Sequence, residues 1–228
     1  MNIQEISDLY AKSPQVAALV KLLEDKSVPT VFLQGLVASA APMMFASAAR
    51  RVSPMCLFVL NDAEEAGYFY HDLTQIMGNT DVLFFPSSYR RQVKYGQRDP
   101  ASEILRTEVL SRLSAPLEGH PLYVVTCPEA LSELVVSRKK LDERTLLLRT
   151  GDTHDVIQLE RTLRDFGFTE VDYVYEPGQF ALRGSILDVF SYSSEYPFRI
   201  DFFGDEVESI RRFDIASQLS TEKLEQVE

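Results

Sequence analysis

The order of apolar runs along the chain is the feature that most limits its fold. In residues 1–128, short runs that lack polar alternation are separated by stretches with helical periodicity. The runs lie at 30–33, 55–60, 81–85 and 122–126. Strands that alternate with helices form parallel sheets, and continuously apolar strands are covered on both faces. The sequence therefore predicts a parallel-sheet α/β domain in this part of the chain.

The pattern changes near residues 128–136, where the spacing between apolar runs shortens. A strand is predicted at 144–149, followed by a helix whose apolar positions share one side and which ends at Gly167. Five more strands are predicted after it, at 171–175, 179–183, 186–190, 197–202 and 207–213. One helix followed by closely spaced strands is typical of a small α+β domain with an antiparallel sheet.

These patterns divide the chain into two domains, at 1–128 and 129–213. The remaining residues, 214–228, form a polar and acidic tail. Because the tail completes no predicted element, we interpret it as the start of the next subdomain of a longer protein.

The charge is distributed unevenly between the two domains. Residues 1–128 carry 11 Lys and Arg against 13 Asp and Glu, a net charge of -2, whereas residues 129–228 carry 12 against 21, a net charge of -9. Proteins bind DNA mainly by neutralising phosphates with Lys and Arg. The second domain is therefore a poor DNA surface, and the asymmetry suggests that the two domains have different partners.

Several classes of protein are disfavoured by what the sequence lacks. It has no run of about 18 apolar residues and no signal-peptide pattern at its start. Cys56 and Cys127 form no metal-ligand spacing with each other, and His71, His120 and His154 have no Cys or His partner at ligand spacing. We therefore expect a cytoplasmic protein with reduced cysteines and no metal. No nucleophile–base pair is recognisable, which indicates a non-enzymatic chain.

The junction after the first predicted strand, Gly35 to Pro42, has the position of a phosphate-binding loop. Such a loop has the pattern G-x-x-x-x-G-K-[ST], in which Lys and a hydroxyl side chain hold the phosphates and Mg²⁺. Here Ala40 replaces the second Gly, Ala41 replaces the Lys, and Pro42 replaces the hydroxyl residue. We predict a degenerate loop that binds no nucleotide cofactor, with an ordinary strand–glycine–helix junction as the alternative.

One stretch, from Tyr89 to Arg98, combines positive charge with aromatic side chains. Its basic residues are Arg90, Arg91, Lys94 and Arg98. Such a combination can grip phosphates and stack bases. The alternative is a solvated loop whose charges pair with nearby carboxylates. The stretch is a candidate nucleic-acid contact.

Two segments of the second half carry a resemblance to a known family. Residues 183–190, RGSILDVF, resemble the pattern R-G-x-[LIV]-[LIV]-[DE]-[LIV]-F. Residues 199–211, RIDFFGDEVESIR, resemble R-[LIV]-[DE]-F-F-[GD]-D-E-[LIV]-[DE]-x-[LIV]-R. Both patterns occur at this spacing in a family of bacterial repair proteins that includes UvrB and the transcription-repair coupling factors (Mfd). The chain resembles this family over essentially its whole length.

The resemblance implies a particular branch of the family. Residues 1–128 resemble its first helicase-like subdomain, 1a, and residues 129–213 resemble its inserted domain 2. UvrB has an intact phosphate-binding loop and a long aromatic hairpin that inserts into DNA. In this chain the loop is degenerate, and the 13 residues from Ser87 to Asp99 are too few for that hairpin. Both differences favour the coupling-factor branch.

For that branch, the resemblance implies a non-catalytic module that recruits the damage-recognition protein UvrA to stalled RNA polymerase in nucleotide excision repair. Domain 2 would bind UvrA. Contacts with RNA polymerase and DNA, ATP-dependent DNA translocation, and a C-terminal domain that masks the UvrA surface would lie outside these residues. The alternative is a UvrB-like helicase fragment that uses ATP or contacts DNA through residues 89–98.

Four side chains are the candidates for contact with UvrA: Arg183, Phe190, Phe180 and Arg199. The resemblance places Arg183 at a position that takes part in UvrA binding, and a guanidinium group can present two parallel N–H donors to a partner carboxylate. An internal salt bridge to Asp188 or Glu176 is the alternative role for Arg183. For the two phenylalanines the alternative is a place in the core.

Overall fold

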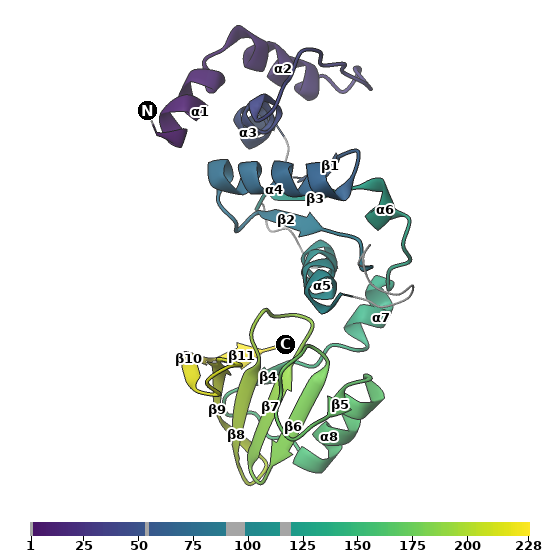
Figure 1. Ribbon diagram of the computed structural model, residues 1–228, viewed down its shortest axis with the longest axis vertical. Coiled ribbons are helices and arrows are strands. Elements are labelled where there is room, and N and C mark those ends of the chain that lie inside the picture. The colour runs from purple at the N-terminus through teal and green to yellow at the C-terminus, as the bar shows by residue number, and fades with distance from the viewer. Residues whose placement is uncertain (1, 53–54, 90–98, 115–119) are drawn as a thin grey trace. The chain divides into compact units, whose positions relative to one another are not determined.

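The computed structural model describes residues 2–52, 55–89, 99–114 and 120–228 (Figure 1). The chain forms two compact units. The first unit comprises Met1–Ser88 and Val109–Leu134, and the second comprises Tyr89–Glu108 and Val135–Glu228. Helix α5 (Pro100–Ser114) contributes residues to both units.

The first unit is built from alternating helices and strands. In chain order its other described elements are α1 (Ile3–Ala11), α2 (Pro14–Glu24), α3 (Ala40–Val52), β1 (Met55–Val59), α4 (Ala63–Met77), β2 (Val82–Phe85), β3 (Leu122–Thr126) and α6 (Pro128–Leu131). The strands form a parallel sheet in the order β1-β3-β2. All five residues of the central strand β3 are buried. A parallel sheet was the expectation from the continuous apolar runs, and it is confirmed.

Capping residues explain where two of these helices begin. The side chain of Asn2 accepts a hydrogen bond from the backbone N–H of Glu5 at 2.8 Å, and the Glu5 carboxylate accepts one from the backbone of Asn2 at 2.9 Å. Asp62 accepts hydrogen bonds from the backbone N–H groups of Glu64 and Glu65, both at 2.9 Å. The first N–H groups of a helix have no partner within it, so these side chains stabilise α1 and α4.

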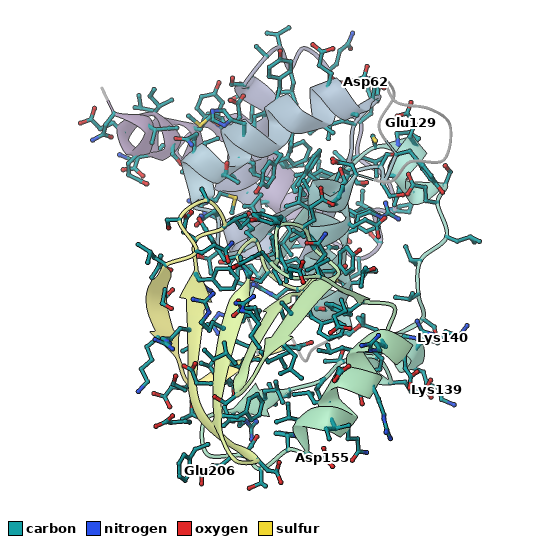
Figure 2. The ribbon with its side chains drawn as sticks, turned by 60° about the horizontal axis from the view of Figure 1, so that its bottom comes forward. Asp62, Glu129, Lys139, Lys140, Asp155 and Glu206 are labelled. Atoms are coloured by element: carbon teal, nitrogen blue, oxygen red, sulfur yellow. The ribbon has the colours of Figure 1, made fainter. Side chains whose placement is uncertain are left out.

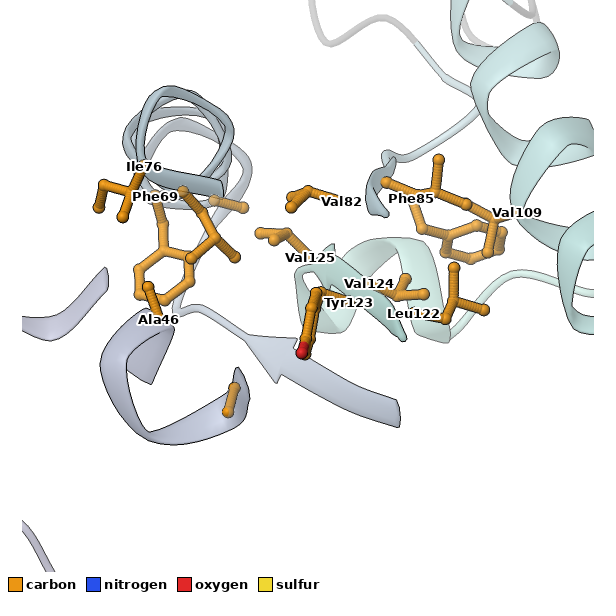
Figure 3. Close-up of a cluster of buried hydrophobic side chains, with 14 of the residues drawn as sticks. Ala46, Phe69, Ile76, Val82, Phe85, Val109, Leu122, Tyr123, Val124 and Val125 are labelled. Carbon is orange, nitrogen blue, oxygen red and sulfur yellow. The ribbon is translucent and has the colours of Figure 1, made fainter. Parts of the chain in front are cut away.

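The core of the first unit lies between the sheet and helices α3 and α4. Ala46 of α3, Phe69 and Ile76 of α4, and Val125 of β3 are all buried in one cluster. Figure 3 shows these side chains together with others from β2 and β3. Apolar side chains on both faces of β3 thus hold the parallel sheet in place.

The first strand predicted from the sequence, at 30–33, is not formed, and this prediction is wrong. Residues 28–37 contain neither helix nor strand. Val31 and Leu33 pack against a small cluster of α2 and α3, while Phe32 between them is 85% exposed. The segment has the alternation of a strand, but it pairs with no strand among the described residues. Strand propensity without a neighbouring strand does not make a sheet.

The second unit holds a mostly antiparallel sheet. Its described elements besides α5 are α7 (Arg138–Asp142), β4 (Leu148–Arg149), α8 (Val156–Asp165), β5 (Thr169–Glu170), β6 (Gln179–Arg183), β7 (Ile186–Phe190), β8 (Phe198–Phe203), β9 (Glu206–Phe213), β10 (Ser220–Leu224) and β11 (Gln226–Val227). The main sheet has the order β10-β9-β8-β7-β6-β5, in which β5 alone runs parallel to its neighbour, and β11 pairs with β4.

The two faces of this sheet have different compositions. Side chains alternate between the faces along each strand. One face, the helix face, buries Phe180, Leu187 and Ile200 against Leu159 and Leu163 of α8. The other face, which we call the arginine face, carries the polar cluster described below. Because the helix face is apolar and covered while the arginine face also carries charged side chains, a shift of one residue would bury those charges, and each strand can adopt only one register.

Some elements of the second unit differ from their prediction. Residues 171–175 do not form the predicted strand, and the predicted strand at 144–149 shrinks to β4. The tail, in contrast, is ordered: β10 pairs with β9, and β11 pairs with β4. The sequence pattern did not predict these strands, because their side chains are mostly polar. Both faces of an edge strand can be exposed to solvent, so such a strand needs no apolar alternation.

Helix α8 offers a test of how the second unit is stabilised. The carboxylate of Asp155 accepts hydrogen bonds from the backbone N–H groups of Ile157 and Gln158, at 2.9 and 3.1 Å. We expect Asp155→Ala to lower the free energy of unfolding by about 1 kcal/mol, as measured by urea unfolding. Gln158→Ala, an exposed change in the same turn, is the control and should have little effect. Equal losses for both variants would contradict the capping role.

Candidate functional site

The arginine face is organised around one buried carboxylate, Asp188 of β7. Asp188 is 0% exposed. Arg199 of β8 binds it with two parallel hydrogen bonds, from Nε to Oδ1 and from Nη2 to Oδ2, each 2.8 Å long. Residues 188 and 199 lie directly opposite each other in the sheet. This two-point arrangement holds both side chains in one orientation.

Arg183 of β6 completes what we call the arginine cluster: Arg183, Asp188 and Arg199. Its Nη2 donates to Oδ2 of Asp188, and its Nη1 donates to the backbone carbonyl of Asp172 at 2.7 Å. The guanidinium also lies over the ring of Tyr173, 5.1 Å from the ring centre. The Arg183 side chain is nevertheless 36% exposed. The internal salt bridge to Asp188 is therefore formed, and part of the Arg183 side chain still faces solvent.

A small apolar cluster supports the other guanidinium. The guanidinium carbon of Arg199 lies 4.6 Å from the ring centre of Phe213. Phe213 packs with Ala181, Phe190, Val174 and Ile104, and all five residues are buried. A cation over an aromatic ring is attracted by the ring's electrons. Phe213 therefore positions Arg199 through ring contact while Asp188 holds it through two hydrogen bonds.

Hydrogen bonding to Asp188 raises the pKa of Arg199 above its ordinary value, burial opposes the change, and the negative charges of Asp188 and Asp201 add to it. A group whose pKa is raised on folding contributes stability below its unfolded pKa and loses it only as the pH rises through the folded value. For an arginine, both values lie far above neutral pH. The guanidinium of Arg199 therefore stays charged at neutral pH.

The four predicted contact residues have different environments. Arg183 and Arg199 lie on the arginine face and share Asp188. Phe180 is 0% exposed on the helix face, and Phe190 is 3% exposed in the apolar cluster. Neither phenylalanine is exposed in this structure, and both have the alternative role, a place in the core, because the sheet is covered at both positions. The other set of candidates, Arg90, Arg91, Lys94 and Arg98, lies outside the described residues.

The sequence analysis missed two members of the site. Asp188 was considered only as a possible partner of Arg183, although it is the residue that both arginines share. Tyr173 was assigned to a strand that does not form. Strand alternation could have placed Asp188 on the same face as Arg183 and Arg199. No local signal predicts the loop that brings Tyr173 over Arg183.

The Gly35–Pro42 segment adjoins a cavity of about 1050 Å³ in the first unit. Gly35 has a φ of 84°, and Pro42 lies within the first turn of α3. The cavity is lined mainly by apolar side chains of α3, α4 and β1, and its charged side chains are Glu65 and Asp72. Carboxylates repel phosphate. Among the described residues, the lining therefore offers no cation for a phosphate, although it includes the hydroxyl groups of Ser39 and Tyr68.

Two further absences concern the described residues alone. Within the described ranges, no group of three or more His, Cys, Asp or Glu side chains could hold a metal ion. Nor is any helix in those ranges long and apolar enough to cross a membrane.

Comparison with known proteins finds a family model that matches most of the second unit. Residues 146–228 match the family model described as the UvrB interaction domain. These residues contain all three members of the arginine cluster, together with the tail strands β10 and β11.

The particular relatives are transcription-repair-coupling factors. The chain is 28% identical over 192 residues to the factor of Bacillus subtilis (strain 168) and 27% identical over 192 residues to that of Escherichia coli (strain K12). Each match covers 84% of this chain and 16% of the relative. A third match, to the factor of Haemophilus influenzae, is 30% identical over 153 residues and covers 66% of this chain and 13% of the relative. The resemblance inferred from the two motifs is confirmed.

The buried carboxylate leads to a prediction about stability. Asp188→Asn keeps the shape of the side chain but leaves two guanidinium groups without a countercharge. We expect the free energy of unfolding to fall by about 3 kcal/mol, as measured by urea unfolding. Asp201→Asn is the matched control. Asp201 pairs with Arg211, and their side chains are 17% and 38% exposed, so water can hydrate the guanidinium left without its carboxylate and about 1 kcal/mol is expected. Equal losses would contradict a special role for Asp188.

Proposed function

We propose that this chain is the non-catalytic N-terminal module of a transcription-repair-coupling factor, and that its second unit recruits UvrA to stalled RNA polymerase in nucleotide excision repair. The match of residues 146–228 to the UvrB interaction domain supports this proposal, as does the similarity to coupling factors over 84% of the chain. The chain spans about one sixth of the length of the curated relatives that it matches.

The single observation that carries the proposal is the state of Arg183. Its guanidinium is fixed by Asp188, Asp172 and Tyr173, yet 36% of the side chain is exposed. A pre-oriented arginine at a surface binds a partner carboxylate without losing much side-chain freedom, and arginine is among the residues that contribute most to protein interfaces. We propose that Arg183 contacts UvrA directly and that Arg199 positions it through Asp188.

The first unit has a different role in the proposal. We propose that it is a helicase-like scaffold whose phosphate-binding loop is degenerate, with Ala40, Ala41 and Pro42 in place of the residues that would hold phosphate and Mg²⁺. ATP-dependent translocation on DNA and contact with RNA polymerase would then belong to other parts of the protein, as would a C-terminal domain that masks the UvrA surface. We also propose a cytoplasmic location, in keeping with two free cysteine thiols.

A binding experiment with purified UvrA tests the docking site. We expect Arg183→Ala to weaken UvrA binding at least about tenfold. Its fold should survive, because Arg199 still bonds both oxygens of Asp188. Arg161→Ala removes an exposed arginine from α8 and is the matched control, with unchanged binding expected. Binding is measured by biolayer interferometry, and circular dichroism checks the fold of each variant. Equal binding by Arg183→Ala and the unchanged chain would refute the assignment.

Nucleotide binding tests the scaffold role. We expect no detectable association of Mg²⁺·ATP with this chain at micromolar concentrations, because the Gly35–Pro42 segment has no cation and no hydroxyl group at the positions that contact phosphate. Isothermal titration calorimetry measures the association of Mg²⁺·ATP with the chain. Saturable micromolar binding would favour the alternative, a helicase-like fragment that uses ATP.

A further inference from the structure

A row of cations crosses the sheet of the second unit beside the arginine cluster. Asp188 of β7 lies opposite Arg199 of β8, which in turn lies opposite Arg211 of β9. Arg211 lies opposite Lys223 of β10. Directly opposed residues of antiparallel strands project from the same face, with their Cβ atoms about 5 Å apart. We call Arg199, Arg211 and Lys223 the cation row.

The carboxylates within the face do not balance this row. Like charges opposite each other destabilise a sheet. Asp188 pairs with Arg199, and Asp201 pairs with Arg211. Along the described part of the chain, no carboxylate pairs with Lys223, and the buried Nε of Arg211 has no acceptor. Two adjacent cross-strand rows of this face hold four cations and two carboxylates, namely Arg183, Arg199, Arg211, Lys223, Asp188 and Asp201.

The excess of cations on the arginine face contrasts with the negative charge of the rest of this part of the chain. Residues 129–228 carry a net charge of -9, from 12 Lys and Arg against 21 Asp and Glu. A carboxylate-rich partner is attracted to the cation row and repelled by the acidic surface around it, which fixes where such a partner can bind. The acidic surroundings also weaken attraction to a long polyanion such as DNA, whose charge extends beyond a single strip.

We propose that the docking surface extends from Arg183 along the cation row to Lys223 at the β10 edge, and that it takes a carboxylate-rich segment of the protein partner. Arg211 is 38% exposed at its side chain, and Lys223 is exposed, so both can reach a partner. This inference rests on the proposed function, because it assigns the chemistry of the same docking face.

Lys223→Glu separates docking from folding, because its two effects have opposite signs. In the free chain it replaces two opposed cations by an opposite-charge pair with Arg211, and we expect the Tm to rise by about 2 °C. In the complex it repels an acidic segment, and we expect UvrA binding to weaken about three- to tenfold at low salt. Thermal circular dichroism and biolayer interferometry measure the two effects. A merely structural role would move Tm and affinity in the same direction.

Lys140→Glu is the matched control, since it makes the same change of charge at an exposed site of the second unit. Figure 2 shows Lys140 on α7, on the side of that unit away from the yellow strand β10. We expect its Tm and UvrA affinity to match those of the unchanged chain. An equal loss of affinity in Lys140→Glu would overturn the inference, because net charge alone would then explain the effect. Unchanged UvrA affinity in Lys223→Glu would overturn it while leaving the proposed function intact.

A hexaglutamate peptide tests the row without UvrA. By fluorescence anisotropy, we expect the unchanged chain to bind the labelled peptide at low salt, and Lys223→Glu to bind it more weakly. That result supports binding of acidic segments by the cation row even if UvrA itself fails to bind. In that case only the proposed function is refuted. A labelled twelve-nucleotide single strand is the competing ligand. Tighter binding of this oligonucleotide than of hexaglutamate would overturn the choice of an acidic protein segment.

Discussion

The carboxylate of Asp188, shared by two arginines, is the interaction on which the candidate site depends. It is fully buried, and it joins three strands through side chains, since Arg183 is on β6, Asp188 on β7 and Arg199 on β8. A buried charge without a partner costs several kcal/mol. The cluster therefore has one stable arrangement, in which each guanidinium is held where the sheet places it. A partner that meets Arg183 finds its orientation already fixed.

Charge distinguishes the two units as much as fold does. The first unit holds a parallel sheet whose central strand is buried throughout, and the charged side chains described in the lining of the cavity beside Gly35–Pro42 are carboxylates. The second unit is acidic as a whole but concentrates cations on one face of its sheet. The geometry thus offers a surface for an acidic partner in one unit and a mainly apolar framework in the other.

The sequence predicted those features that local patterns encode. Continuous apolar runs predicted β1, β2 and β3, and closely spaced apolar runs predicted strands β6 to β9. The prediction from the sequence failed where pairing with a strand distant along the chain decides whether a strand forms. Residues 30–33 have strand propensity but pair with no strand, and the polar tail becomes strands because β9 and β4 lie beside it. At the site, the motifs located Arg183 and Arg199, but the burial of Phe180 and Phe190 depends on what covers each face.

The pairing of β11 with β4 has a consequence for synthesis on the ribosome. Gln226 pairs with Arg149, and the N–H of Thr150 donates to the carbonyl of Glu225 at 3.0 Å. The residues that begin the second unit's strands are therefore joined to residues that are translated well after them. Strands β6 to β9 pair with their neighbours in sequence, so they can form hairpins while the chain is being synthesised. Strand β4 cannot pair with β11 until Val227 has left the exit tunnel. Folding of the acidic unit is thus completed late, after nearly eighty further residues have emerged from the tunnel.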